Sequence, residues 1–148
     1  MTDQLDRRGF VRRATGALAA TPLGMLLASC AALAARVVPV QEGKLRLAFS
    51  HYPELETAGG SLKLAPAGFD TPVYVLTLGR GEFAALSPIC THLGCTVDIQ
   101  GSRIVCPCHG STYDREGRVL QGPAERALTR FATTIDDGVL VIDLRGRA

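Results

Sequence analysis

The sequence predicts an all-β domain, and three observations support this fold class. After residue 43 the chain is a series of short apolar or alternating runs between turn residues, which is the pattern of strands. No part of it keeps an apolar period of 3.6 residues beyond a turn or two, so helix content should be low. Four of the five cysteines and two of the three histidines gather in two loops, 90–95 and 106–113. We therefore expect a strand-rich domain that carries a small metal-binding subdomain.

The first residues of the chain have the character of an export signal. Residues 6–12, which include Arg7 and Arg8, resemble a twin-arginine signal and lack only the favoured Ser or Thr before the arginine pair. The simpler interpretation is the basic start of an ordinary signal peptide. The twin-arginine interpretation is favoured because that pathway exports folded proteins, which suits a domain loaded with a cofactor in the cytoplasm. We expect the domain to lie at the periplasmic face of the bacterial inner membrane.

The segment that follows is apolar and uncharged. Residues 14–35 comprise 22 positions without a charge, enough to cross the roughly 30 Å hydrocarbon core of a membrane as a helix. Three fates are open. The segment remains as an N-terminal helical anchor, or it is cut at an Ala-rich site such as 32–34, or residues 27–30 act as a lipobox and Cys30 becomes the acylated first residue. Residues 1–35 are thus expected to be signal and anchor.

The charge of the mature domain argues against a nucleic-acid partner. Residues 36–148 hold 12 Lys and Arg against 12 Asp and Glu, so the net charge of +2 comes wholly from the leader. Proteins that bind nucleic acid neutralise phosphates with an excess of basic residues. Membrane attachment through the N-terminal segment is the contact that the sequence favours instead.

Residues 36–43, with Pro39, are expected to form a tether to a domain that covers 44–148. The expected strands are 45–49, 61–64, 73–78, 83–87, 96–99, 103–105, 118–120, 128–135 and 139–144. Two hairpin turns stand out, Gln-Gly-Ser at 100–102 and Asp-Asp-Gly at 136–138. The first hairpin lies between the two cysteine loops, so both loops would be attached to one rigid element.

Each loop offers a thiol and an imidazole at close spacing. The first contains Cys90 and His92, and the second contains Cys106 and His109. Thiolates are soft ligands and imidazoles are intermediate ones. Two of each fit either a tetrahedral zinc or a two-iron cluster with Cys on one iron and His on the other. Each loop also holds one further cysteine, and the residues alone leave both metal centres open.

The order C-T-H-L-G-C (90–95) followed by C-P-C-H-G-S-T-Y (106–113) resembles the paired loops of Rieske [2Fe-2S] proteins. The resemblance is strong from residue 86 to residue 124. It implies a Rieske-type antiparallel β sandwich or barrel with a cluster-binding subdomain, preceded here by an apolar helix. It also implies that Cys90 and Cys106 bind the inner iron and that His92 and His109 bind the outer iron of the [2Fe-2S] cluster.

In the high-potential branch of that family, two further cysteines form a disulfide, which here would join Cys95 and Cys108. By the same resemblance, Ser111 donates a hydrogen bond to a bridging sulfide, and Tyr113 donates one to the Cys90 thiolate. Hydrogen bonds to sulfur favour the reduced cluster and so raise its potential. Gly110 lies in the cluster-holding loop. Residues 122–124, with Pro123, resemble the family's Pro loop, which covers the cluster from a third side.

The two histidines are expected to couple electron and proton transfer. If the outer ring nitrogens of His92 and His109 reach solvent, each can lose a proton, so reduction is coupled to proton uptake. The resemblance implies that His109 hydrogen-bonds a quinol and that Leu93 makes apolar contact with the partner's quinol pocket. His51, which stands apart from the loops, is interpreted as a surface or packing residue.

The function implied is that of a non-catalytic electron-transfer subunit. It would accept electrons from quinol in a cytochrome bc-type complex, beside cytochrome b, and pass them to a c-type cytochrome. One alternative is the small Rieske subunit of an exported molybdenum oxidase of the arsenite oxidase type. Another is a free-standing exported lipoprotein carrier. Only ten residues separate Cys95 from Cys106, fewer than we expect of respiratory-complex subunits, so both alternatives are retained.

Overall fold

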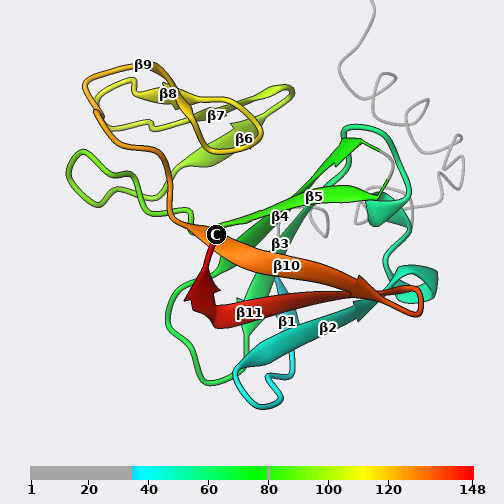
Figure 1. The fold of residues 1–148 in the computed structure, drawn as a ribbon. Coiled ribbons are helices and arrows are strands. Elements are labelled where there is room, and N and C mark those ends of the chain that lie inside the picture. The colour runs from blue at the N-terminus through cyan, green and yellow to red at the C-terminus, as the bar shows by residue number, and fades with distance from the viewer. Residues whose placement is uncertain (1–34, 80) are drawn as a thin grey trace, which may run out of the picture. The chain divides into compact units, whose positions relative to one another are not determined.

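The computed structural model describes residues 35–79 and 81–148, which are almost entirely strands and loops (Figure 1). The strands are β1 (Arg36–Val38), β2 (Lys44–Ala48), β3 (Ser61–Pro66), β4 (Val73–Gly79), β5 (Glu82–Leu86), β6 (Asp98–Gln100), β7 (Arg103–Val105), β8 (Thr112–Tyr113), β9 (Val119–Gln121), β10 (Arg130–Asp136) and β11 (Val139–Arg147). Two short 3-10 helices, η2 (Phe49–His51) and η3 (Pro53–Leu55), follow β2. The predicted all-β class is confirmed.

The expected N-terminal helix, the twin-arginine motif and Cys30 lie outside the described residues. Within the described part of the chain, no helix has the length and apolar character needed to cross a membrane.

Seven strands form a large sheet in the order β1-β3-β4-β5-β10-β11-β2, which curves into a near-barrel. Its pairs are antiparallel except for β1 with β3. Alternating side chains of β2 and β3 point to the inner face of the sheet: Leu45 and Leu47 of β2 and Leu62 and Leu64 of β3 are buried. These side chains belong to the core inside the large sheet.

Strands β4 and β5 are buried on both faces, and this positions the rest of the unit. Val73, Val75 and Phe83 point into the core inside the large sheet. Their neighbours along the strands point the other way, into a second core. This second core contains Tyr74, Leu76, Ala84, Leu86, Cys90, Val97, Ile104, Cys106, Tyr113, Ala124 and Leu128. The two cysteine loops therefore rest on the outer face of β4 and β5.

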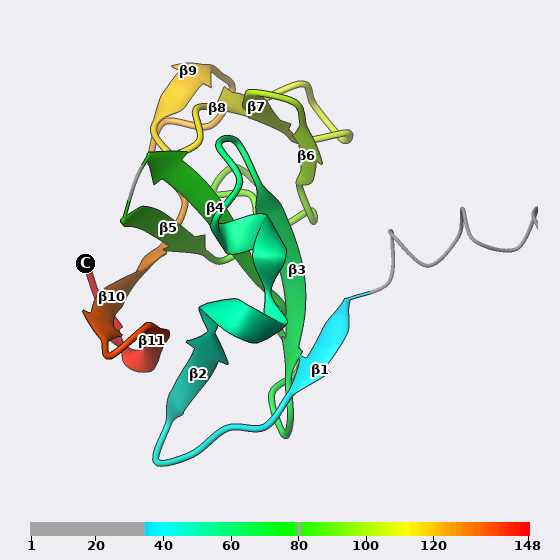
Figure 2. The same ribbon diagram turned by 90° about the vertical axis from the view of Figure 1, so that its right-hand side faces the viewer.

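A second sheet of four short strands, in the order β6-β7-β8-β9, carries the loops. Figures 1 and 2 show it beyond one end of the large sheet in both views. The hairpin predicted at 100–102 joins β6 to β7, as expected. The hairpin predicted at 136–138 joins β10 to β11, and Asp137 and Gly138 both have positive φ there, 43° and 72°, as a type I′ turn requires.

Two strands, β1 and β8, lie outside the predicted strands. β1 occupies the start of the expected tether, where Val38 alone of the three residues is buried. β8 has only two residues and follows the second loop directly. Neither is long enough to show an apolar period, and each exists because a neighbouring strand supplies its hydrogen bonds.

Candidate metal centre

The two cysteine loops share one backbone design. In each loop the amide of the first Cys donates to the carbonyl five residues later, at 2.8 Å in both cases. The amide of the Gly four residues after that Cys donates back to the Cys carbonyl, at 2.9 Å for Gly94 and 3.0 Å for Gly110. Both glycines have positive φ, 82° and 76°, a conformation that strains other residues. The motif spacing is thus a requirement of the turn.

The loops bring two thiols and two imidazoles to one end of the unit. Cys90 and Cys106 are free and buried, at 3% and 2% exposure. The rings of His92 and His109 meet edge to face with their centroids 4.9 Å apart. Nδ1 of His92 is buried and has no hydrogen-bond partner among the residues that the structure describes. A buried nitrogen without a partner and two buried thiols are the groups that a metal cluster satisfies.

Cys95 and Cys108 are joined by a disulfide that links the two loops. The Sγ atoms of Cys95, Cys106 and Cys108 lie within 4.8 Å of one another. Because two of these three sulfurs are bonded to each other, the trio is not a metal site by itself. The disulfide leaves one thiol in each loop for metal binding, so the donor set is two Cys and two His. This set fits a Rieske-type two-iron cluster, and a zinc site gives no reason for the adjacent disulfide.

Tyr113 lies beside the first of these thiols. Its hydroxyl oxygen is 3.2 Å from Sγ of Cys90 and 3.2 Å from Oγ1 of Thr91. Burial and the contact with Cys90 raise the pKa of Tyr113, so its hydroxyl keeps its proton. Burial alone would raise the pKa of the Cys90 thiol, but hydrogen bonds, with that of Tyr113 foremost, bring it below its usual value. The pair therefore favours a thiolate beside a phenol donor.

Ser111 is completely buried and connects the second loop to the segment 122–126. Its Oγ accepts a hydrogen bond from the amide of Ala124 at 3.0 Å. Its own proton remains available for a further acceptor. On the other side, Oγ1 of Thr91 donates to the carbonyl of Arg126. The segment 122–126, which contains the expected Pro loop (122–124) with a cis bond between Gly122 and Pro123, is thus held by one hydroxyl from each cysteine loop.

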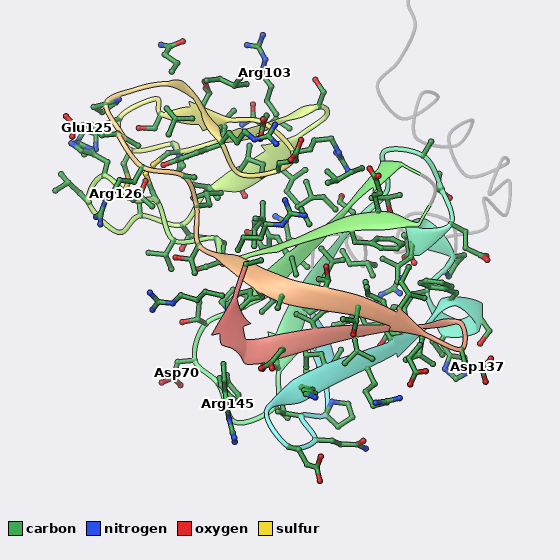
Figure 3. The ribbon with its side chains drawn as sticks, viewed as in Figure 1. Asp70, Arg103, Glu125, Arg126, Asp137 and Arg145 are labelled. Carbon is green, nitrogen blue, oxygen red and sulfur yellow. A yellow bond between two sulfur atoms is a disulfide. The ribbon has the colours of Figure 1, made fainter. Side chains whose placement is uncertain are left out.

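The surface around the loops is apolar at its tip. Leu93, in the first loop, is 69% exposed. His109, in the second loop, and Pro123, in the segment 122–126, are exposed as well. Figure 3 shows Glu125 and Arg126 at this same end of the unit, whereas Asp137 lies in the far hairpin. His51 is exposed on η2 and takes no part in the cluster of side chains.

Thr91 and Arg115 are not among the site residues predicted from the sequence. Thr91 lies between two expected ligands, so its position in the motif was a usable signal. Arg115 follows Tyr113 by two residues and donates to backbone carbonyls of three segments. No sequence pattern marks such a residue, because its acceptors are main-chain atoms far along the chain.

Comparison with known families agrees with the donor set. The family model described as "Rieske [2Fe-2S] domain" matches residues 54–132. That range includes both cysteine loops and the segment 122–126.

Two relatives illustrate the extent of the similarity. The cytochrome b6-f complex iron-sulfur subunit of Chlorobaculum tepidum is 31% identical over 141 residues, which are 94% of this chain and 76% of that protein. The subunit of the same name from Prochlorococcus marinus subsp. pastoris is 40% identical over 75 residues, 48% of this chain and 42% of that protein. The chain thus matches less than half the length of the second relative.

Solved structures give the same picture. The cyanobacterial plasma membrane Rieske protein PetC3 from Synechocystis PCC 6803 is 35% identical, with a TM-score of 0.53 over 62% of this chain and 92% of that one. The complex of oxygenase and ferredoxin in carbazole 1,9a-dioxygenase contains a chain that is 21% identical, with a TM-score of 0.56 over 73% of this chain and 98% of that one. The second likeness concerns the fold alone.

Proposed function

Because this chain belongs to the Rieske [2Fe-2S] family, we propose that Cys90 and Cys106 bind one iron of the cluster and that His92 and His109 bind the other. One observation carries this proposal: two buried free thiols and two adjacent imidazoles lie on disulfide-linked loops, with Nδ1 of His92 buried and without a partner among the described residues. The cysteines lie deep in the second core and the His109 ring is exposed. Because the cysteines are buried and His109 is exposed, the histidine side of the cluster would face a partner.

When bound, a Rieske cluster accepts and releases one electron at a higher potential than an all-thiolate cluster, because neutral imidazoles replace two thiolates. The chain's own residues adjust that potential. Tyr113 donates to the Cys90 thiolate, and the free proton of the Ser111 hydroxyl points to a second donor. The exposed ring of His109 can hold or release a proton at the nitrogen that does not face the metal. The Pro loop limits the access of water.

We further propose that quinol is the electron donor and that the partners are cytochrome b and a c-type cytochrome. The relatives that support this are named as iron-sulfur subunits of cytochrome b6-f complexes. The disulfide, Ser111 and Tyr113 belong to the high-potential branch, which favours quinol oxidation over the role of a small subunit in a molybdenum oxidase. Leu93 is exposed and follows His92, whose ring contacts that of His109, so it can supply the apolar contact that a quinol pocket would need.

The test is a redox titration of the purified full chain by EPR at several pH values. We expect a Rieske signal whose midpoint lies well above zero millivolts and falls as the pH rises through neutrality. A low, pH-independent midpoint would contradict quinol oxidation and leave the cluster assignment intact. Metal analysis that finds zinc without iron would contradict both the cluster assignment and quinol oxidation. As matched variants, His92→Ala should abolish the signal, and His51→Ala, on an exposed histidine, should preserve it.

Export and attachment are proposals from the leader alone. We propose twin-arginine export to the periplasmic face and attachment through residues 14–35 or an acylated Cys30. Replacing Arg7 and Arg8 together by Lys should retain the protein in the cytoplasm, and unaffected export would contradict this route. Cys30→Ser should release the protein from membranes only if the cysteine carries the lipid, so continued attachment would favour the helical anchor.

A further inference from the structure

Arg115, in the turn between β8 and β9, places its guanidinium between the two sheets. Nη1 donates to the carbonyl of Gly101, in the β6–β7 turn, at 2.9 Å. Nη2 donates to the carbonyls of Gly59 and Gly60, in the loop before β3, at 2.9 and 2.7 Å. A longer contact of 3.5 Å reaches the carbonyl of Thr77 on β4. One side chain therefore links two turns of the small sheet to β4 and to the loop before β3 of the large sheet.

The Arg115 side chain is half-buried and has no acidic partner within residues 35–79 and 81–148. None of the ion pairs among the described residues includes Arg115. Its Nε is buried without a hydrogen-bond partner in that same part of the chain, and burial lowers the pKa of the guanidinium. Removing a cation from water is unfavourable unless good acceptors replace the water. Here main-chain carbonyls do so, and the planar fork of arginine can bond several at once.

The position of Arg115 relates it to the second cysteine loop. That loop runs directly into β8, where Tyr113 lies against Cys90, and Arg115 follows two residues later. The first loop has its own attachment just downstream. The Tyr74 hydroxyl donates to the carbonyl of Val97 at 3.0 Å, and Lys63 pairs with Asp98 at 3.3 Å. Each loop is thus tied to the large sheet by different side chains.

We propose that Arg115 is a positioning residue that fixes the second cysteine loop, and with it the cluster, on the large sheet. The two sheets then move as one body, so the distance between the cluster and the large sheet stays constant when a partner binds at the tip. This inference rests on the proposed placement of the cluster between the loops. It concerns geometry and does not depend on the identity of the electron donor.

The test measures the distance between the reduced cluster and a nitroxide label by pulsed EPR on the full chain. The label is attached to Thr134→Cys, at an exposed position of β10, in a Cys30→Ser background so that one accessible thiol reacts. Arg115→Met keeps an unbranched apolar stem in place of the arginine stem and removes the guanidinium donors. The matched control is Arg118→Met in the same turn, where the arginine side chain is 67% exposed and pairs with Asp114 and Glu116.

The parent protein and Arg118→Met should give the same narrow distance distribution. Arg115→Met should give one that is roughly twofold wider, and Arg115→Lys, which keeps a charge and fewer donors, should lie between them. An unchanged width in Arg115→Met would overturn the proposal, as would equal broadening in the Arg118→Met control. Absence of a Rieske signal in the parent protein would instead refute the cluster placement.

A second measurement covers the case in which Arg115→Met does not retain its cluster. Hydrogen exchange is then compared between the cluster-free parent and variant. Faster exchange confined to β6, β7, β8 and β9 supports a positioning role. Equal acceleration in both sheets shows that Arg115 only stabilises the whole fold, and this result would overturn the proposal.

Discussion

The hydroxyl oxygen of Tyr113 lies 3.2 Å from Sγ of Cys90, inside the core that joins the two sheets. The same oxygen is 3.2 Å from Oγ1 of Thr91, whose proton is donated to the carbonyl of Arg126. Tyr113 has a single proton to share between the sulfur and the threonine. The strength of the Tyr113 hydrogen bond to the thiolate therefore depends on how the carbonyl of Arg126 holds the Thr91 hydroxyl.

Tyr113→Phe should lower the midpoint potential of the cluster. The variant removes the donor to the Cys90 thiolate and keeps the ring in its buried site. A hydrogen bond to a charged group contributes about 1.5–3 kcal/mol, so its loss from the reduced state lowers the one-electron potential by at most roughly 65–130 mV. An EPR-monitored redox titration measures the change. Tyr52→Phe, which alters a half-buried tyrosine beside η3, is the control and should leave the potential unchanged.

Thr91→Val should loosen the Pro loop. The substitution keeps the shape of the side chain but removes the hydroxyl that donates to the carbonyl of Arg126. We expect faster hydrogen exchange in residues 122–127. We also expect faster loss of the cluster, which the decay of its visible absorbance measures. Thr96→Val, at an exposed threonine beyond the same loop, should change neither rate. Equal rates in Thr91→Val and the parent would show that Ser111 alone holds the Pro loop.

Replacing Cys95 and Cys108 together by Ala should destabilise the cluster loops. The disulfide closes a loop of 13 residues in sequence, and a cross-link of this length contributes about 3 kcal/mol to the free energy of unfolding. Urea unfolding of the oxidised parent and of the double variant measures the difference. Reduction of the parent with dithiothreitol should reproduce the loss. A double variant as stable as the oxidised parent would contradict this role.

Tyr74 should make the protein less stable at alkaline pH. Burial raises its pKa above 10.0, so above that pH the unfolded chain loses a proton that the folded chain retains, and stability falls as the pH rises. Tyr74→Phe lacks this titration. At pH 7 the variant should be less stable by about 1–3 kcal/mol, because the carbonyl of Val97 loses its donor. The difference in the free energy of unfolding between the parent and Tyr74→Phe, measured with urea, should narrow between pH 9 and 11. A constant difference would contradict the raised pKa of Tyr74.

Most of the fold could be predicted from the order of apolar residues. The alternation in β2 and β3 and the longer runs in β4 and β5 are visible in the sequence because each strand buries several side chains. β1 and β8 could not be predicted in this way. They contain three and two residues, and their hydrogen bonds come from strands elsewhere in the chain.

The sequence by itself determined the chemistry of the centre. Cys and His at fixed spacing, with glycines where the loops need positive φ, form a local code that can be recognised without a structure. Only the tertiary structure decided how the centre is held. Arg115 binds carbonyls up to 56 residues away, and Thr91 binds a carbonyl 35 residues away. Main-chain carbonyls occur at every position and have no side-chain signature, so only folding selects the ones that these side chains reach.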